Sequence, residues 1–196
     1  MLSFIISFVK VILLLILFLI TLLYFPLNRQ VPKFSFKTKL DSQIPLLPWT
    51  VWVYFSYFLF FPLSIALTWN SRYASPLLVT QIFSTLIASL IWKVFPNGVI
   101  RPLIKTPTNL NHRLLSLIYK YDRDCNGLPS GHVLQSFVAC FFLALLFPKI
   151  WVVFVLVLLA ISLSTLTTKQ HYFLDMIITL LFAPLIIELS LYIIPL

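Results

Sequence analysis

The chain has 196 residues, of which 61% are hydrophobic and 10% charged, and its mean hydropathy is +1.03. This composition excludes an ordinary soluble domain and is typical of an integral membrane protein. The net charge of +9 suits a surface that meets anionic lipid head groups or phosphorylated substrates. Because the cations are spread over loops between apolar segments, with no basic domain or aromatic platform, they do not indicate nucleic-acid binding.

Six apolar segments follow one another along the chain. Backbone groups in lipid must be bonded within a helix or a closed barrel, and these apolar runs are continuous, so we predict membrane-spanning helices. Their predicted ranges are about 4–25, 48–69, 76–96, 132–147, 149–167 and 172–195. The predicted fold class is therefore all-α: a polytopic membrane protein with six transmembrane helices and an active site at one membrane face.

Two longer loops, residues 26–47 and 97–131, hold most of the lysines and arginines. With six crossings, both loops lie on one face of the membrane. The first span has Lys10 near its start but no small-residue cleavage site after it, so we expect an uncleaved span instead of a signal peptide. We divide the chain into an N-terminal transmembrane anchor with its basic loop (1–47) and a membrane domain (48–196).

The second long loop ends in Pro129-Ser130-Gly131-His132, at the start of the fourth span. A helix that begins here presents unpaired backbone N–H groups and the positive end of its dipole to an anion. Ser130 is suited to capping that helix or to donating its hydroxyl to a phosphate oxygen, and Gly131 lets a phosphate approach the main chain. We predict a phosphate subsite beside His132; the alternative is a capped helix followed by an interfacial histidine.

A second polar group, His171 and Asp175, lies at the start of the sixth span. Four residues apart on a helix, the two side chains share a face, and the carboxylate can accept a hydrogen bond from one ring nitrogen. The other nitrogen is then free to act as a base or nucleophile. The same spacing also suits a divalent ion, but no further Asp, Glu or Cys accompanies the pair, and we expect no metal.

Two histidines, an anion-binding helix start and nearby cations together indicate phosphoryl transfer through a phosphohistidine. One histidine attacks phosphorus and the other protonates the leaving oxygen, while cations and backbone donors stabilise the charge on the equatorial oxygens. The phosphoryl group then passes to water or to an alcohol.

These motifs resemble the type 2 phosphatidic acid phosphatase superfamily over about residues 50 to 195. The family's second motif, Pro-Ser-Gly-His, is present unchanged, and the His-x3-Asp that ends its third motif is present as His171 and Asp175. The resemblance implies that His171 is the nucleophile, Asp175 its orienting partner and His132 the general acid. It also implies that Ser130 and Gly131 hold the phosphate and that no cofactor takes part.

Two motifs depart from the family pattern. The first, Lys-x6-Arg-Pro, is present as Lys93 and Arg101-Pro102 with seven residues between the lysine and the arginine, and we assign both cations to phosphate binding. In the third motif Thr165 stands where the family has an arginine, so a bidentate guanidinium contact is missing. Lys169 is the nearest cation that could take part of that role; the alternative is an ordinary interfacial lysine.

The altered third motif looks like that of inositol phosphorylceramide synthases and related sphingolipid head-group transferases. Three functions stay open: hydrolysis of a lipid phosphate, which we favour, transfer of a head group to a lipid hydroxyl, and a degenerate protein that binds or transports lipid. The expected partners are the bilayer and a phosphorylated membrane lipid, without nucleic acid. The sequence leaves the oligomeric state open.

The two arguments about orientation disagree. The positive-inside rule places the two basic loops in the cytoplasm. The family resemblance instead implies a site that faces the periplasm or lumen. We expect a multi-pass protein of the cell or inner membrane, with its site on the periplasmic or lumenal face.

Overall fold

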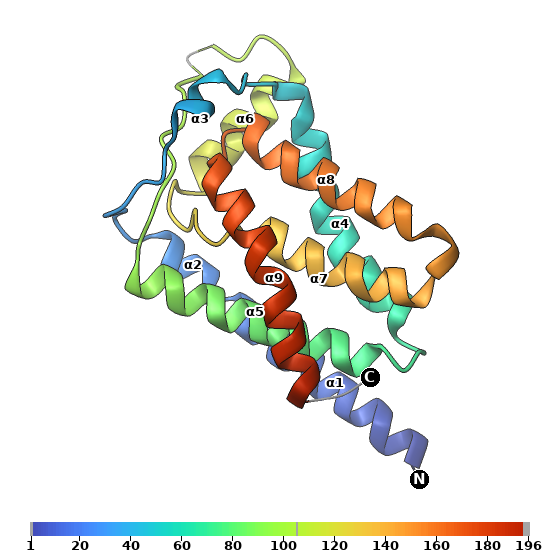
Figure 1. The fold of residues 1–196 in the computed structure, drawn as a ribbon. Coiled ribbons are helices and arrows are strands. Elements are labelled where there is room, and N and C mark those ends of the chain that lie inside the picture. The colour runs from blue at the N-terminus through green and yellow to red at the C-terminus, as the bar shows by residue number, and fades with distance from the viewer. Residues whose placement is uncertain (1, 105, 194–196) are drawn as a thin grey trace.

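The computed structural model of the protein describes residues 2–104 and 106–193, and its regular elements there are helices (Figure 1). The six long helices are α1 (Leu2–Thr21), α4 (Val51–Thr68), α5 (Ala74–Val94), α7 (Gly131–Leu146), α8 (Trp151–Thr167) and α9 (Phe173–Ile193). The shorter helices are α2 (Tyr24–Asn28), α3 (Lys39–Gln43) and α6 (Leu110–Tyr121), with 3-10 turns η1 at Pro48–Thr50 and η2 at Pro148–Ile150.

Five helical segments are long and apolar enough to cross a membrane: Ile5–Asn28, Pro48–Thr68, Ala74–Val94, Pro148–Thr167 and Phe173–Ile193. The sixth predicted span is α7, which is apolar but has only 16 residues. At about 1.5 Å per residue it is about 24 Å long, less than the ~30 Å of a hydrocarbon core. The chain is therefore an all-α, multi-pass membrane protein, and five of the six predicted spans are confirmed by length and composition.

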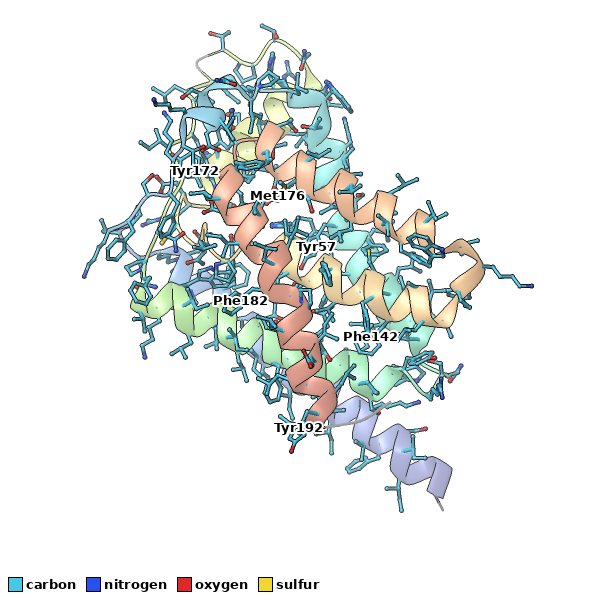
Figure 2. The ribbon with its side chains drawn as sticks, in the orientation of Figure 1. Tyr57, Phe142, Tyr172, Met176, Phe182 and Tyr192 are labelled. Atoms are coloured by element: carbon cyan, nitrogen blue, oxygen red, sulfur yellow. The ribbon has the colours of Figure 1, made fainter. Side chains whose placement is uncertain are left out.

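Helix α7 lies at the centre of the bundle, where it packs against α4, α5, α8 and α9. Its inner face contributes Val138 and Phe142, both fully buried, to a core that also contains Leu77 and Leu78 of α5. Figure 2 shows Phe142 inside the bundle and Tyr192, 88% exposed, at its periphery. Helix α1 packs mainly on α5 and leaves most of its apolar side chains facing outward, as a lipid-facing helix does.

The second long loop contains a helix that the sequence analysis did not predict. Helix α6 begins after Asn109, whose side chain accepts a hydrogen bond from the backbone N–H of His112, as a helix cap does. Leu115 and Ile118 are buried against the start of α4. The helix was missed because its apolar residues form one stripe in a polar sequence, too few to resemble a span.

The N-terminal segment, predicted as an anchor, makes polar contacts with the remainder of the chain. The Tyr24 hydroxyl and the Asn28 amide of α2 both donate to the Asp122 carboxylate after α6. Asp41 of α3 accepts from the backbone N–H of Phe173, the first residue of α9, over 2.7 Å. Residues 1–47 therefore contribute directly to the end of the bundle where α7 and α9 begin.

Candidate active site

His132 and His171 lie at the same end of the bundle, on the wall of one cavity of about 440 Å³. Helices α1, α2, α4, α5 and α7 line this cavity, together with the end of α6 and the loops before α7 and α9. The centres of the two imidazole rings are 6.2 Å apart. One phosphoryl group between them could contact both rings.

The beginning of α7 has the predicted N-cap. The Ser130 side chain accepts from the backbone N–H of Val133 over 3.4 Å, and the Ser130 N–H donates to the Thr179 hydroxyl of α9 over 2.8 Å. Ser130 is fully buried and does not line the cavity, whereas Gly131 does. The structure thus places the Ser130 side chain in helix capping and not at the surface where a phosphate would bind.

Gly131 is packed closely under an aromatic ring. A Cβ atom at this position would lie 3.4 Å from the Trp92 ring, and the Trp92 indole N–H donates to the Pro129 carbonyl over 3.0 Å. The ring therefore fixes the turn into α7. Gly131 and His132, the first two residues of α7, line the cavity, and the first backbone N–H groups of a helix have no intrahelical partner.

His132 stands between two tyrosine rings of α4. Its ring centre is 4.4 Å from that of Tyr54 and 4.5 Å from that of Tyr57. Its Nε2 is buried and makes no hydrogen bond within the described residues. The aromatic rings hold the imidazole in place and leave that nitrogen available to a ligand.

His171 lies in the bend that precedes α9, and not on the helix as predicted. Its Nδ1 is 2.8 Å from the Gly127 carbonyl oxygen. Because a carbonyl can only accept, Nδ1 carries the proton in the neutral ring and Nε2 presents a lone pair. Burial, together with the neighbouring His132, lowers the pKa of His171 to about 3, although the Gly127 hydrogen bond opposes the shift.

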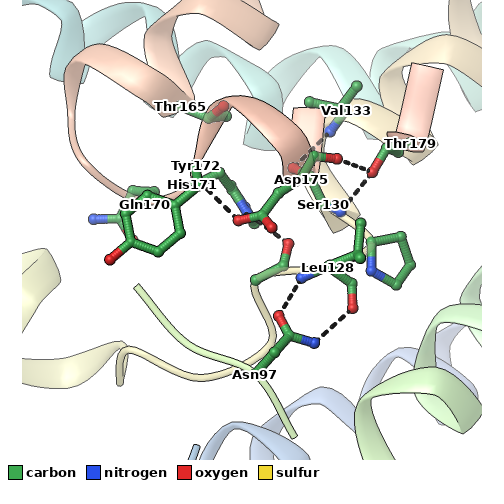
Figure 3. Close-up of polar contacts among 12 residues, drawn as sticks. Asn97, Leu128, Ser130, Val133, Thr165, Gln170, His171, Tyr172, Asp175 and Thr179 are labelled. Carbon is green, nitrogen blue, oxygen red and sulfur yellow. Dashed lines mark hydrogen bonds and ion pairs between the residues drawn. The ribbon is translucent and has the colours of Figure 1, made fainter. Parts of the chain in front are cut away.

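Asp175 does not hydrogen-bond to His171 as predicted. Its Oδ2 lies 3.9 Å from the His171 Nδ1 and accepts instead from the backbone N–H of Tyr172 over 2.8 Å (Figure 3). This bond caps the first turn of α9, which explains why the carboxylate turns from the imidazole. The Gly127 carbonyl occupies the position relative to His171 that the sequence analysis assigned to Asp175.

The turn that carries Gly127 is held by Asn97, a residue that the sequence analysis missed. The Asn97 amide donates to the Phe95 carbonyl over 2.8 Å. It also donates to the Leu128 carbonyl over 2.9 Å, and its oxygen accepts from the Leu128 N–H (Figure 3). A Cβ atom on Gly127 would lie only 2.8 Å from the Asn97 oxygen. The only signal in the sequence was an asparagine between Pro96 and Gly98, and the structure shows it 1% exposed.

Arg101 lines the cavity as predicted. Its guanidinium donates to the Asp122 and Arg123 carbonyls, to the Asp122 carboxylate at 3.3 Å and to the Gln170 Oε1 at 2.6 Å. Its Nε is buried and has no partner within the described residues. The side chain is therefore fixed in the wall with one donor still available.

Lys93 and Lys169 do not reach the cavity. Lys93 is exposed on the last turn of α5, and Lys169 donates to the Asp41 and Ile44 carbonyls over 3.0 and 2.5 Å. Lys93, which is one residue further from Arg101 than in the family's first motif, thus points outward. Lys169 is bound to carbonyls of α3 and of the residue that follows it. At Thr165 the side chain donates to the Ser162 carbonyl over 2.7 Å and is fully buried. Neither lysine replaces the missing arginine.

Two further arginines line the cavity, Arg29 after α2 and Arg123 after α6, and both side chains are exposed. The sequence analysis counted them as loop cations and gave them no role in the site. In the described residues, no three His, Cys, Asp or Glu side chains form a group that could hold a metal ion.

Searches for similar proteins give no match to a family model, to a curated protein or to a solved structure.

Proposed function

We propose that the protein is a membrane lipid phosphatase similar to the type 2 phosphatidic acid phosphatases, with His171 as nucleophile and His132 as general acid. The observation that carries this proposal is the approach of the two rings to 6.2 Å in one cavity, from segments 39 residues apart in the sequence. Arg101 and the start of α7 line the same cavity and provide the cationic and backbone donors that a phosphate requires.

In the first step the lone pair on the His171 Nε2 attacks phosphorus, and the bond from phosphorus to the lipid oxygen breaks. His132 donates a proton to that oxygen, so the lipid leaves as a neutral alcohol. In the second step His132 takes a proton from water, the oxygen attacks phosphorus, and the N–P bond breaks to release inorganic phosphate. The hydrogen bond from Nδ1 to the Gly127 carbonyl supports this role, because it leaves the lone pair of the neutral His171 ring on Nε2.

The proposal includes six crossings, with the short helix α7 as the fourth span. Its longer neighbours α4, α5, α8 and α9 surround it, so protein covers most of its length. A short central span places His132 at the edge of the hydrocarbon, where a lipid phosphate lies. Both basic loops are then on the site face, which we propose is the periplasmic or lumenal one.

Labelling from outside the cell tests this orientation. In a chain whose Cys125 and Cys140 are changed to serine, Ser35→Cys places one exposed thiol in the first basic loop. We expect an impermeant maleimide to label it in intact cells. Labelling only after lysis would place the site in the cytoplasm, as the positive-inside rule predicts.

Transfer of the phosphorus-linked head group to an alcohol is the second candidate. The observation that favours it is a set of buried amide atoms that have no partner within the described residues, on three side chains that line the cavity: Asn28, Asn126 and Gln170. Hydrolysis needs only water as acceptor, whereas an alcohol acceptor needs groups that bind its other hydroxyls.

The test is phosphate release by the purified chain in detergent from a panel of lipid phosphates, in the presence of EDTA. We expect release that falls at least 1,000-fold in His171→Ala and stays within two-fold in His112→Ala, a histidine on α6 outside the cavity. Release that survives in His171→Ala would contradict the mechanism. A chain that binds lipid phosphates but releases no phosphate and forms no new lipid would support the degenerate alternative.

A further inference from the structure

The cavity wall has polar side chains that the phosphohistidine mechanism does not use. Asn28, Asn126 and Gln170 are 5%, 3% and 4% exposed, and each has amide atoms without a partner within the described residues. A buried polar atom without a hydrogen bond is costly, so several such atoms in one cavity indicate a ligand with matching groups.

The orientation of Asn28 is fixed by charge. Its Nδ2 donates to the Asp122 carboxylate and to the Tyr24 hydroxyl, the latter over 2.9 Å. The flipped amide would bring its oxygen against the carboxylate, where two acceptors repel. The unpartnered atom of Asn28 is therefore the acceptor, Oδ1.

Asn126 adds another acceptor to the same cavity. Neither its Oδ1 nor its Nδ2 has a partner among residues 2–104 and 106–193, and its backbone, at a φ of 65°, is in the left-handed region that Asn tolerates. The Gln170 Oε1 accepts from Arg101, which leaves its Nε2 as a donor. The cavity thus presents two acceptors from Asn28 and Asn126 beside several donors.

A phosphate group does not match these acceptors, because an ionised phosphate has oxygens that only accept. The unpartnered Oδ1 atoms instead require O–H or N–H groups. An ammonium group fits the charges poorly, since three arginines (Arg29, Arg101 and Arg123) and one aspartate (Asp122) line the cavity. Neutral hydroxyls fit both the acceptors and the positive potential.

We propose that Asn28 and Asn126 form a hydroxyl subsite beside the histidines, which binds an uncharged hydroxyl-bearing group. This subsite rests on the proposed function and specifies its substrate: the hydroxyl-bearing group is either a polyol head group on the phosphorylated lipid or an acceptor alcohol. In both cases α2, outside the region that resembles the family, contributes a specificity-determining residue. Tyr24 and Asp122 are positioning residues, since they hold the Asn28 amide.

Binding by the full chain in the His171→Ala background tests the subsite without turnover. The probes are phosphatidylglycerol phosphate and an analogue in which 1,3-propanediol replaces the head-group glycerol. The analogue has the same charge and one hydroxyl fewer. We expect the hydroxyl to improve binding about ten-fold, and Asn28→Leu to reduce that ratio to below two. Asn70→Leu, an exposed asparagine at the opposite end of the bundle, is the matched control and should keep the ratio.

A second variant guards against misfolding of Asn28→Leu. Asn126→Gly keeps the left-handed backbone and removes only the amide, and we expect it to lower the same ratio. If His171→Ala with both asparagines intact binds the two probes with affinities that differ less than two-fold, the subsite does not bind a lipid head group. A ratio that stays near ten in both variants would overturn the assignment to these residues.

The acceptor source is tested with the otherwise unchanged chain, phosphatidic acid and glycerol. If the alcohol is the acceptor, the ratio of glycerol phosphate to inorganic phosphate should fall about ten-fold in Asn28→Leu and Asn126→Gly and should stay unchanged in the Asn70→Leu control. No hydroxyl preference in either assay would overturn the subsite. Hydroxyl-selective binding without turnover on any substrate would instead contradict the proposed function and leave the subsite standing.

Discussion

Asn97→Ala should destabilise the turn that orients His171. The substitution removes the acceptor of the Leu128 N–H and a donor to the Leu128 carbonyl, in a position where the Asn97 side chain is 1% exposed. Each buried backbone group left without a partner costs about 1–3 kcal/mol, so we expect the free energy of unfolding to fall by roughly 2–6 kcal/mol. Gly127, one residue earlier, would lose its fixed position, and with it the carbonyl bound to the His171 Nδ1.

Thermal unfolding in detergent, followed by tryptophan fluorescence, measures the stability of this variant. Asn70→Ala is the control, because that side chain is exposed at the opposite end of the bundle. We expect Asn97→Ala to unfold several degrees lower and to lose phosphatase activity at temperatures where it is still folded. Equal unfolding temperatures for the two variants, or an Asn97→Ala chain with full activity, would refute the assignment.

Three further perturbations follow from the site. Arg101→Lys should raise KM about ten-fold, because lysine cannot reproduce the fixed guanidinium, whereas Lys93→Ala should change KM less than two-fold. Lys169→Ala should lower the unfolding temperature with KM unchanged, since its Nζ donates to the Asp41 and Ile44 carbonyls and lies away from the cavity. A raised KM would show that Lys169 contacts the phosphate. The buried His171, whose pKa lies near 3 against about 6.5 unfolded, binds fewer protons in the folded chain. Stability should therefore be complete above about pH 6.5 and decline as the pH falls toward 3, with a smaller decline in His171→Gln.

The spans could be predicted because each is a continuous apolar run, and their observed ends lie within a few residues of the predicted ones. The element that differs is α7, which is bounded by the Ser130 cap and by Pro148. Helix α6 could not be recognised from mean hydropathy, because its buried residues, Leu115 and Ile118, form a narrow stripe. The contact between α2 and Asp122 joins residues 94 or more apart, which no local pattern reports.

The sequence motifs predicted which residues line the cavity better than they predicted the hydrogen bonds between those residues. His132, His171 and Gly131 line the cavity at helix starts whose positions follow from sequence spacing, and Arg101 lines it from the loop between α5 and α6. The expected bond between His171 and Asp175 assumed that both lie on one helix. The helix begins two residues later, so a backbone carbonyl takes the place of the carboxylate.

The most direct test of the account is to identify the covalent intermediate. The chain is incubated with a ³²P-labelled lipid phosphate, quenched in alkali, in which phosphohistidine survives, and digested for mass spectrometry. Because the Gly127 carbonyl holds the proton on Nδ1, we expect phosphate on His171 and specifically on Nε2. Label on the Nδ1 of His171, on another residue, or on His171→Ala would contradict the mechanism.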